Sequence, residues 1–70
     1  MSNLDKSHQI LNKVVEQQEL TLGWETNRET LKEGRNLFVF ECMFSDDNNK
    51  VTTKRFQVSV GNEFVKELKR

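Results

Sequence analysis

Two runs of alternating apolar and polar residues in the middle of the chain predict a β-hairpin. The first covers residues 37–44 and the second covers residues 51–60, and both are rich in residues that favour strands. Residues 45–50 between them are all polar, and the Asn and Asp residues among them tolerate the backbone conformations of a tight turn. We therefore expect residues 36–60 to form a hairpin.

The alternation also predicts how the two strands align. The apolar faces consist of Phe38, Phe40, Cys42 and Phe44 in the first strand, and of Phe56, Val58 and Val60 in the second. Both sets have even numbers, so the numbers of paired residues must add up to an even number if the two apolar faces coincide. A two-residue loop at 48–49 would mix the faces, whereas a loop of three or five residues centred on Asn48 keeps them together. Such a loop pairs Phe40 with Phe56, and it also pairs Phe38 with Val58.

Both ends of the chain show a helical pattern. Residues 3–19 carry apolar residues at helical spacing, and Ser2 stands where an N-cap is needed. Residues 62–70 show a shorter pattern, with Asn62 as the N-cap and with Lys and Arg residues at the end, where they complement the helix dipole. We expect a short terminal helix there, and it must dock on the sheet because it is too short to be stable alone.

Residues 20–35 fit two interpretations. Leu20, Leu22 and Trp24 alternate with polar or small residues, which favours a short strand at 20–25 followed by a turn or a single helical turn that ends at Gly34. In the alternative, the first helix extends through this stretch.

These elements predict one α+β domain that spans residues 1–70. The domain has two layers, with the N-terminal helix and the short C-terminal helix packed on an antiparallel sheet of two to three strands. The order of elements is α-β-β-β-α, or α-β-β-α if residues 20–25 form no strand. A chain of 70 residues buries a modest share of its surface, so its stability is marginal.

The charges narrow the choice of partners and location. Eleven basic and eleven acidic residues give a formal net charge of zero, whereas a dedicated nucleic-acid-binding domain usually carries a basic excess. The single cysteine forms no internal disulfide, and a secreted domain of this size usually has several. The polar N-terminus and the lack of a long apolar run predict a cytoplasmic protein with no membrane partner.

The residues that could support catalysis are few. His8 is expected to be a solvated helix residue, and Cys42 lies on the aromatic face of its strand, where a buried thiol stays protonated and inert. Nothing in the pattern brings these two residues together. The acidic turn at 46–49 lacks the spacing of a calcium loop, and the glycines are too isolated for a phosphate loop. We expect no enzyme activity, no cofactor and no metal site.

The second face of the first hairpin strand gives the clearest indication of function. Leu37, Val39 and Met43 point away from the phenylalanines, where a solvated sheet would carry polar residues. One interpretation is that Trp24, Leu31 or the first helix covers this face. The other is that a protein partner or a second copy of the chain binds there, since large exposed apolar patches on small proteins are often functional.

Together these observations predict a small protein-interaction module that forms a homodimer and binds a protein partner. Such a module would act as an accessory or regulatory protein, possible also in a phage, since its small size and charged, near-neutral composition are typical of phage-type regulatory proteins. The expected contact residues are Trp24, Leu37, Val39 and Met43, with Trp24 as an anchor because tryptophan is enriched at interaction hot spots.

Nucleic-acid binding is the alternative. Its candidate residues form a basic stripe on the second hairpin strand and the C-terminal segment: Lys50, Lys54, Arg55, Lys66, Lys69 and Arg70. They would contact phosphates while Phe56 stacks on a base. Against this, Lys54 and Arg55 point to opposite faces of the strand, and Phe56 is needed in the core.

Overall fold

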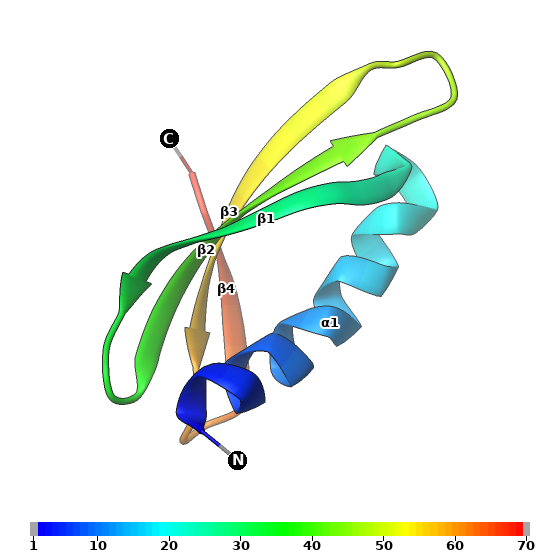
Figure 1. Cartoon of the computed structure of the whole chain (residues 1–70). Coiled ribbons are helices and arrows are strands. Elements are labelled where there is room, and N and C mark those ends of the chain that lie inside the picture. The colour runs from blue at the N-terminus through cyan, green and yellow to red at the C-terminus, as the bar shows by residue number, and fades with distance from the viewer. Residues whose placement is uncertain (1, 70) are drawn as a thin grey trace.

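The computed structural model of the chain describes residues 2–69, which form one helix and four strands. The elements in chain order are α1 (Asn3–Leu22), β1 (Trp24–Glu33), β2 (Leu37–Ser45), β3 (Val51–Ser59) and β4 (Phe64–Leu68). The strands form one antiparallel sheet in the order β1-β2-β3-β4, and α1 crosses one of its faces (Figure 1). The predicted α+β class is therefore confirmed, with an N-terminal helix packed on an antiparallel sheet.

The predicted C-terminal helix is wrong, because Phe64–Leu68 form the edge strand β4. The expected helix also included Arg70, which lies outside the described residues. A helix of this length has little intrinsic stability, whereas pairing with β3 gives hydrogen-bond partners to the backbone groups on one edge of the strand. The pairing also places Val65 opposite Val58, on the face that α1 covers.

The prediction for residues 20–35 is also corrected, because α1 continues to Leu22 and β1 covers 24–33 without a helical turn. With β1 and β4 both present, the sheet has four strands rather than two or three. The register of β1 against β2 shifts between Glu25 and Asn27 and again between Thr30 and Lys32. Each shift interrupts the alternation of faces, so the sequence of β1 lacks the regular period of two that identifies a strand.

Gly23 makes the sharp transition from α1 to β1 possible. Its backbone has φ of +100°, a conformation that L side chains rarely adopt, and its N–H donates to the carbonyl of Glu19 at 3.3 Å. A Cβ at this position would collide with the backbone carbonyl of Ser45. Only glycine therefore fits at the junction.

The predicted register of the hairpin is confirmed, with Phe40 opposite Phe56 and Phe38 opposite Val58. The pair of Ser45 and Val51 closes a five-residue loop, one of the two lengths that the alternation allows.

The side chain of Asp46 organises this loop. Its Oδ1 accepts hydrogen bonds from the backbone N–H groups of Asn48 and Lys50 at 2.8 and 2.9 Å. Asn49 has φ of 61°, which asparagine tolerates better than most residues. The turn chemistry that the sequence predicted is thus present.

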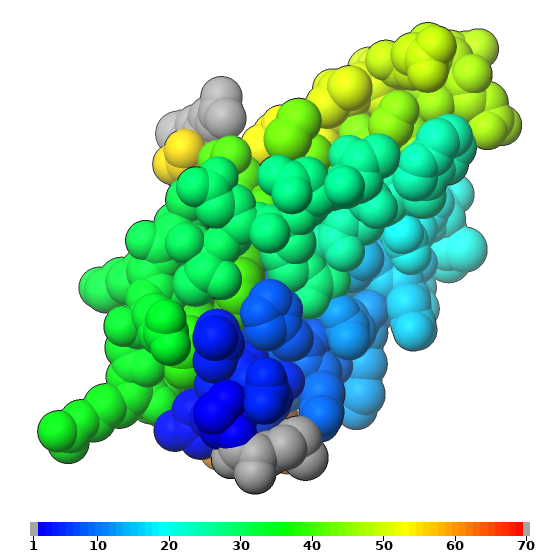
Figure 2. Space-filling model, in the orientation of Figure 1, coloured from blue at the N-terminus to red at the C-terminus, as the bar shows by residue number. Residues whose placement is uncertain are grey.

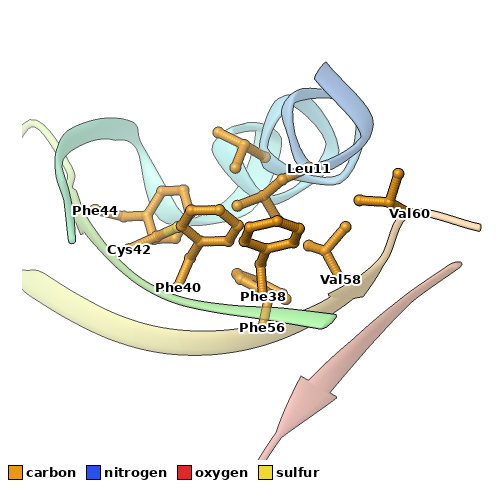
Figure 3. Packing of buried hydrophobic residues seen from close by; sticks show 9 residues of the cluster. Leu11, Phe38, Phe40, Cys42, Phe44, Phe56, Val58 and Val60 are labelled. Atoms are coloured by element: carbon orange, nitrogen blue, oxygen red, sulfur yellow. The ribbon is translucent and has the colours of Figure 1, made fainter. Parts of the chain in front are cut away.

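The core lies between α1 and the phenylalanine face of the sheet (Figure 3). Figure 3 shows the phenylalanines of β2 directed at Leu11 of α1. The buried apolar residues are Leu11, Val15, Phe38, Phe40, Cys42, Phe44, Phe56, Val58 and Val60. The predicted N-cap of α1 is also present, since Ser2 Oγ accepts a hydrogen bond from the backbone N–H of Asp5.

Asn36 ties together two turns that are distant in the sequence. Its Oδ1 accepts a hydrogen bond from the backbone N–H of Gly61 at 2.6 Å, and its Nδ2 donates to Ser59 Oγ at 3.2 Å. Its backbone carbonyl also accepts from the N–H of Val60. The β1–β2 turn is thereby fixed to the β3–β4 turn, which positions the edge strand β4.

Candidate functional site: the outer face of the sheet

The face of the sheet opposite α1, here called the outer face, brings together the four residues predicted to bind a partner. Leu37, Val39 and Met43 alternate with the buried residues of β2, and Trp24 joins them because it pairs with Ser45 of the same face. Trp24 is 51% exposed and Leu37 is 41% exposed, while Val39 and Met43 are partly buried by their neighbours.

Further apolar residues on the outer face come from the neighbouring strands. By register, Val51 lies opposite Ser45, Phe64 opposite Ser59, and Leu68 opposite Arg55. Phe64 is 60% exposed. The sequence indicated neither Phe64 nor Leu68 as outer-face residues, because residues 62–70 were predicted to be a helix and only the pairing with β3 assigns them to this face.

No element within residues 2–69 covers the outer face. The helix packs on the phenylalanine face, and the Cα atoms extend over 38 × 21 × 17 Å, the dimensions of one sheet with one helix on it. The first helix therefore does not cover Leu37, Val39 and Met43, because α1 lies on the other side, while Trp24 belongs to the same face and Leu31 is itself 43% exposed.

A band of charged residues crosses the middle of the outer face. Arg55 Nε lies 2.8 Å from Glu41 Oε2, and Glu29 pairs in register with Glu41. Lys32 and Lys66 lie in the adjacent row, opposite Val39 and Gln57. The face therefore carries both signs of charge between its apolar ends.

The basic residues proposed for nucleic-acid binding do not form a stripe. Lys54 lies on the helix-covered face and forms an ion pair with Glu67 at 3.2 Å, whereas Arg55 lies on the outer face with Glu41. Phe56 is 1% exposed and unable to stack on a base. Lys50 ends the hairpin loop, Lys66 is in β4, Lys69 follows it, and Arg70 lies outside the described residues.

His8 is not the solvated residue that the sequence suggested. Its ring centre lies 4.7 Å from that of Phe40, and its Nδ1 is 3.0 Å from an Nη atom of Arg28 in β1. Figure 2 shows the two elements concerned, α1 in blue to cyan and β1 in green, side by side on the surface. Partial burial, followed by the positive charge of Arg28, lowers the pKa of His8 from its ordinary value of 6.5.

Cys42 is fully buried, as the sequence predicted, and lies opposite Arg28 in the register of β1 and β2. Burial, and then hydrogen bonding to Glu25, raises the pKa of the Cys42 thiol to about 12. Arg28 in turn holds Glu25 through two hydrogen bonds of 2.8 and 2.9 Å. Nothing in the sequence pattern places His8 near Cys42, but both lie beside Arg28. This proximity could not be predicted because it depends on a strand at 24–33 that the pattern does not indicate.

This cluster links α1 to the sheet and does not activate a nucleophile. The thiol of Cys42 remains protonated at neutral pH, and the Nδ1 atom of His8 is engaged by Arg28.

A groove separates α1 from β4 at the far edge of the sheet. Its larger hollow has a volume of about 250 Å³ and is lined by Ile10, Lys13, Val14, Glu63, Phe64 and Val65. A smaller hollow of about 130 Å³ adjoins it along α1 and adds Lys6 and Gln9 to the lining.

Residues 2–69 contain no group of three or more His, Cys, Asp and Glu side chains arranged to hold a metal ion. They also contain no helix of the length and apolarity that crossing a bilayer requires. Comparison of the chain with protein-family models, with curated proteins and with solved structures finds no match.

Proposed function

We propose that the chain is a non-enzymatic protein-interaction module that self-associates through the outer face of its sheet and acts as an accessory or regulatory protein. The observation that supports this proposal is the open outer face with its exposed Trp24, Leu37, Val51 and Phe64. An antiparallel sheet can leave one face in water, but that face is then usually polar. Apolar side chains there gain free energy when a second surface removes them from water.

The charges of the outer face favour a second copy of the chain as the occupant. Glu29 and Glu41 are acidic, while Lys32, Arg55 and Lys66 are basic, so the face carries near-equal numbers of both signs. A two-fold axis places the same surface on both sides of an interface, and such a surface must be complementary to itself. A face with one sign of charge would repel its own copy, whereas this one can match acid with base.

The size of the outer face predicts a dimer that dissociates on dilution. With strands about 4.8 Å apart and about 3.3 Å per residue, the face measures roughly 19 by 25 Å, or about 500 Å². That is below the ~800 Å² per partner of a standard stable interface.

The experiment compares the sedimentation of the double variant Val39→Thr with Met43→Thr against that of the unmodified chain at equal concentration. Both threonines keep the shape of a strand residue and remove apolar contact, so we expect a smaller average mass and an unchanged circular dichroism spectrum. Leu20→Thr is the matched control, because Leu20 is 79% exposed at the end of α1, away from the outer face. An unchanged mass in the double variant contradicts the proposal.

A second variant covers the case in which the double variant unfolds. Leu37→Lys changes a residue that is 41% exposed, and it places a charge within the apolar end of the face. We expect a folded protein whose association is abolished, and a dimer that persists in this variant contradicts the proposal.

A further inference from the structure

The two edges of the sheet differ in how they are protected. Strand β1 carries two register shifts and presents several charged side chains, both of which discourage pairing with another strand. Strand β4, at the opposite edge in Figure 1, pairs with β3 in a regular register from Phe64 to Leu68. The outer edge of β4 is therefore the one suited to accept a further strand.

The groove between α1 and β4 lies where alternate side chains of an added strand would point. Val65 faces the side that α1 covers, since it is opposite Val58, and it lines the hollow of about 250 Å³ together with Ile10 and Val14. Successive side chains of a strand point to opposite faces of a sheet. Every second residue of a strand paired with β4 would thus enter this groove, where an apolar side chain finds an apolar wall.

The charged side chains around the groove select the partner's charge. Lys6 and Lys13 line it, and in the part of the chain that the structure describes neither forms an ion pair. Glu63 is the acidic residue of the lining, whereas nearby Glu67 is engaged with Lys54. Two lysines against one free carboxylate make the groove basic, so it favours an acidic side chain.

Pairing of β4 with β4 of a second copy is disfavoured by like charges. The antiparallel register that aligns all five residues places Lys66 opposite Lys66 of the copy. A shift by one pair in either direction leaves only three residues of β4 paired, with Glu67 opposite Glu67 in one case and Val65 opposite Val65 in the other. The edge therefore fits a segment of different sequence.

We propose that the edge of β4 and the adjoining groove bind an extended segment of another protein, with an apolar and an acidic residue two positions apart. The backbone of the segment would pair with β4, its apolar side chain would occupy the hollow by Val14 and Val65, and its carboxylate would lie at Lys13 or Lys6. Phe64 borders both the outer face and the hollow, whereas Trp24, Leu37, Val39 and Met43 stay free in this arrangement, so the inference does not depend on self-association.

The test uses a fluorescein-labelled peptide of sequence Thr-Val-Thr-Glu-Thr-Val-Thr-Glu, titrated with the full chain by fluorescence polarisation. In a strand its Val and Glu side chains share one face. A peptide with Lys in place of Glu tests the charge preference. A version with N-methyl groups on the edge that faces β4 tests strand pairing, because these groups remove the N–H donors. We expect the Glu peptide to bind at least tenfold more tightly than either control.

Three protein variants locate the binding. Lys13→Glu should weaken binding of the Glu peptide at least tenfold, and Glu63→Gln should strengthen it. Lys32→Glu makes the same change of charge on β1, at the opposite edge, and should leave the affinity unchanged. The double variant Val39→Thr with Met43→Thr should also bind normally, even if it no longer self-associates.

Several outcomes overturn the inference. It fails if the Glu peptide does not bind at about 1 mM protein, if the Lys peptide binds equally well, or if N-methylation has no effect. It fails as well if Lys32→Glu weakens binding as much as Lys13→Glu does, since the attraction would then be a general effect of charge. None of these results bears on the mass of the protein in solution, which tests the outer face separately.

Discussion

Arg28 of β1 donates a hydrogen bond from its guanidinium to Nδ1 of His8 in α1, over 3.0 Å. A guanidinium has donors and no acceptor, so Nδ1 must be unprotonated, and the proton of the neutral ring is on Nε2. The same guanidinium holds Glu25 through two hydrogen bonds. The contact thus joins the helix to an edge strand and requires His8 to stay neutral.

Acidification should therefore destabilise the fold. The pKa of His8 is lowered in the folded chain, so the unfolded chain takes up a proton first as the pH falls below 6.5. The contribution of His8 is complete above pH 6.5, and it is lost as the pH falls from there through the lower pKa of the folded state. We expect the free energy of unfolding in urea to decrease over this range.

The variant His8→Asn isolates the contribution of the imidazole. The asparagine Oδ1 can accept a hydrogen bond near the position of Nδ1 and does not titrate. We expect the free energy of unfolding of this variant to vary less with pH than that of the unmodified chain between pH 7.5 and 5. If both proteins lose the same free energy of unfolding, protonation of His8 is not the cause.

The thiol of Cys42 should be unreactive until the protein unfolds. Its side chain is fully buried, and its pKa of about 12 leaves almost no thiolate at pH 8. We expect labelling by an aromatic disulfide reagent at pH 8 to be slower in buffer than in 6 M urea by at least several hundred-fold, since it requires global opening, which costs at least about 3.5 kcal/mol in a domain of this size. Comparable rates would mean that the sheet and helix separate locally around Cys42.

Replacement of Gly23 should be the most damaging glycine substitution in the chain. In Gly23→Ala the new Cβ would meet the Ser45 carbonyl in a backbone conformation with φ of +100°. We expect a loss of about 3 kcal/mol, much of the stability of a domain of this size. The control is Gly61→Ala, whose Cβ would meet the Asn36 side chain, with Oδ1 at 2.9 Å, rather than a backbone carbonyl, and whose φ is not in the left-handed range. Equal unfolding midpoints in urea for the two variants would contradict this account.

Glu63 offers a way to stabilise the protein. It has φ of 50° in the β3–β4 turn, a left-handed conformation that costs most L residues free energy and asparagine less. We expect Glu63→Asn to raise the free energy of unfolding by about 0.5–1 kcal/mol. Glu63→Gln removes the same charge without the tolerance of asparagine for this conformation and should give no such gain, and equal gains in the two variants would point to charge rather than backbone conformation.

The hairpin could be predicted because its physical determinants are local. Phe40 and Phe56 belong to regular alternations, and a polar loop of the right length lies between them, so burial of both rings leaves one register. The same alternation assigned Leu37, Val39 and Met43 to one face. Whether that face was covered depended on where α1 packs, and the hairpin sequence contains no information about that.

The edge strands could not be predicted because their conformation depends on their neighbours. Phe64, Val65 and Leu68 fit a helical stripe as well as a strand, and the open edge of β3 decides between them. In β1, the register shifts remove the alternation, and Arg28 is partly buried beside Glu25 and His8, which it contacts. The polar link between helix and sheet was therefore invisible until both elements were in place.

The measurement that tests the central claim most directly is the solution mass of the unmodified chain as a function of concentration, by sedimentation equilibrium. If the outer face binds a second copy, the average mass should rise from the chain mass of 8.3 kDa toward twice that value as the concentration increases from micromolar to millimolar. A mass that stays at 8.3 kDa over this whole range would contradict self-association through the outer face.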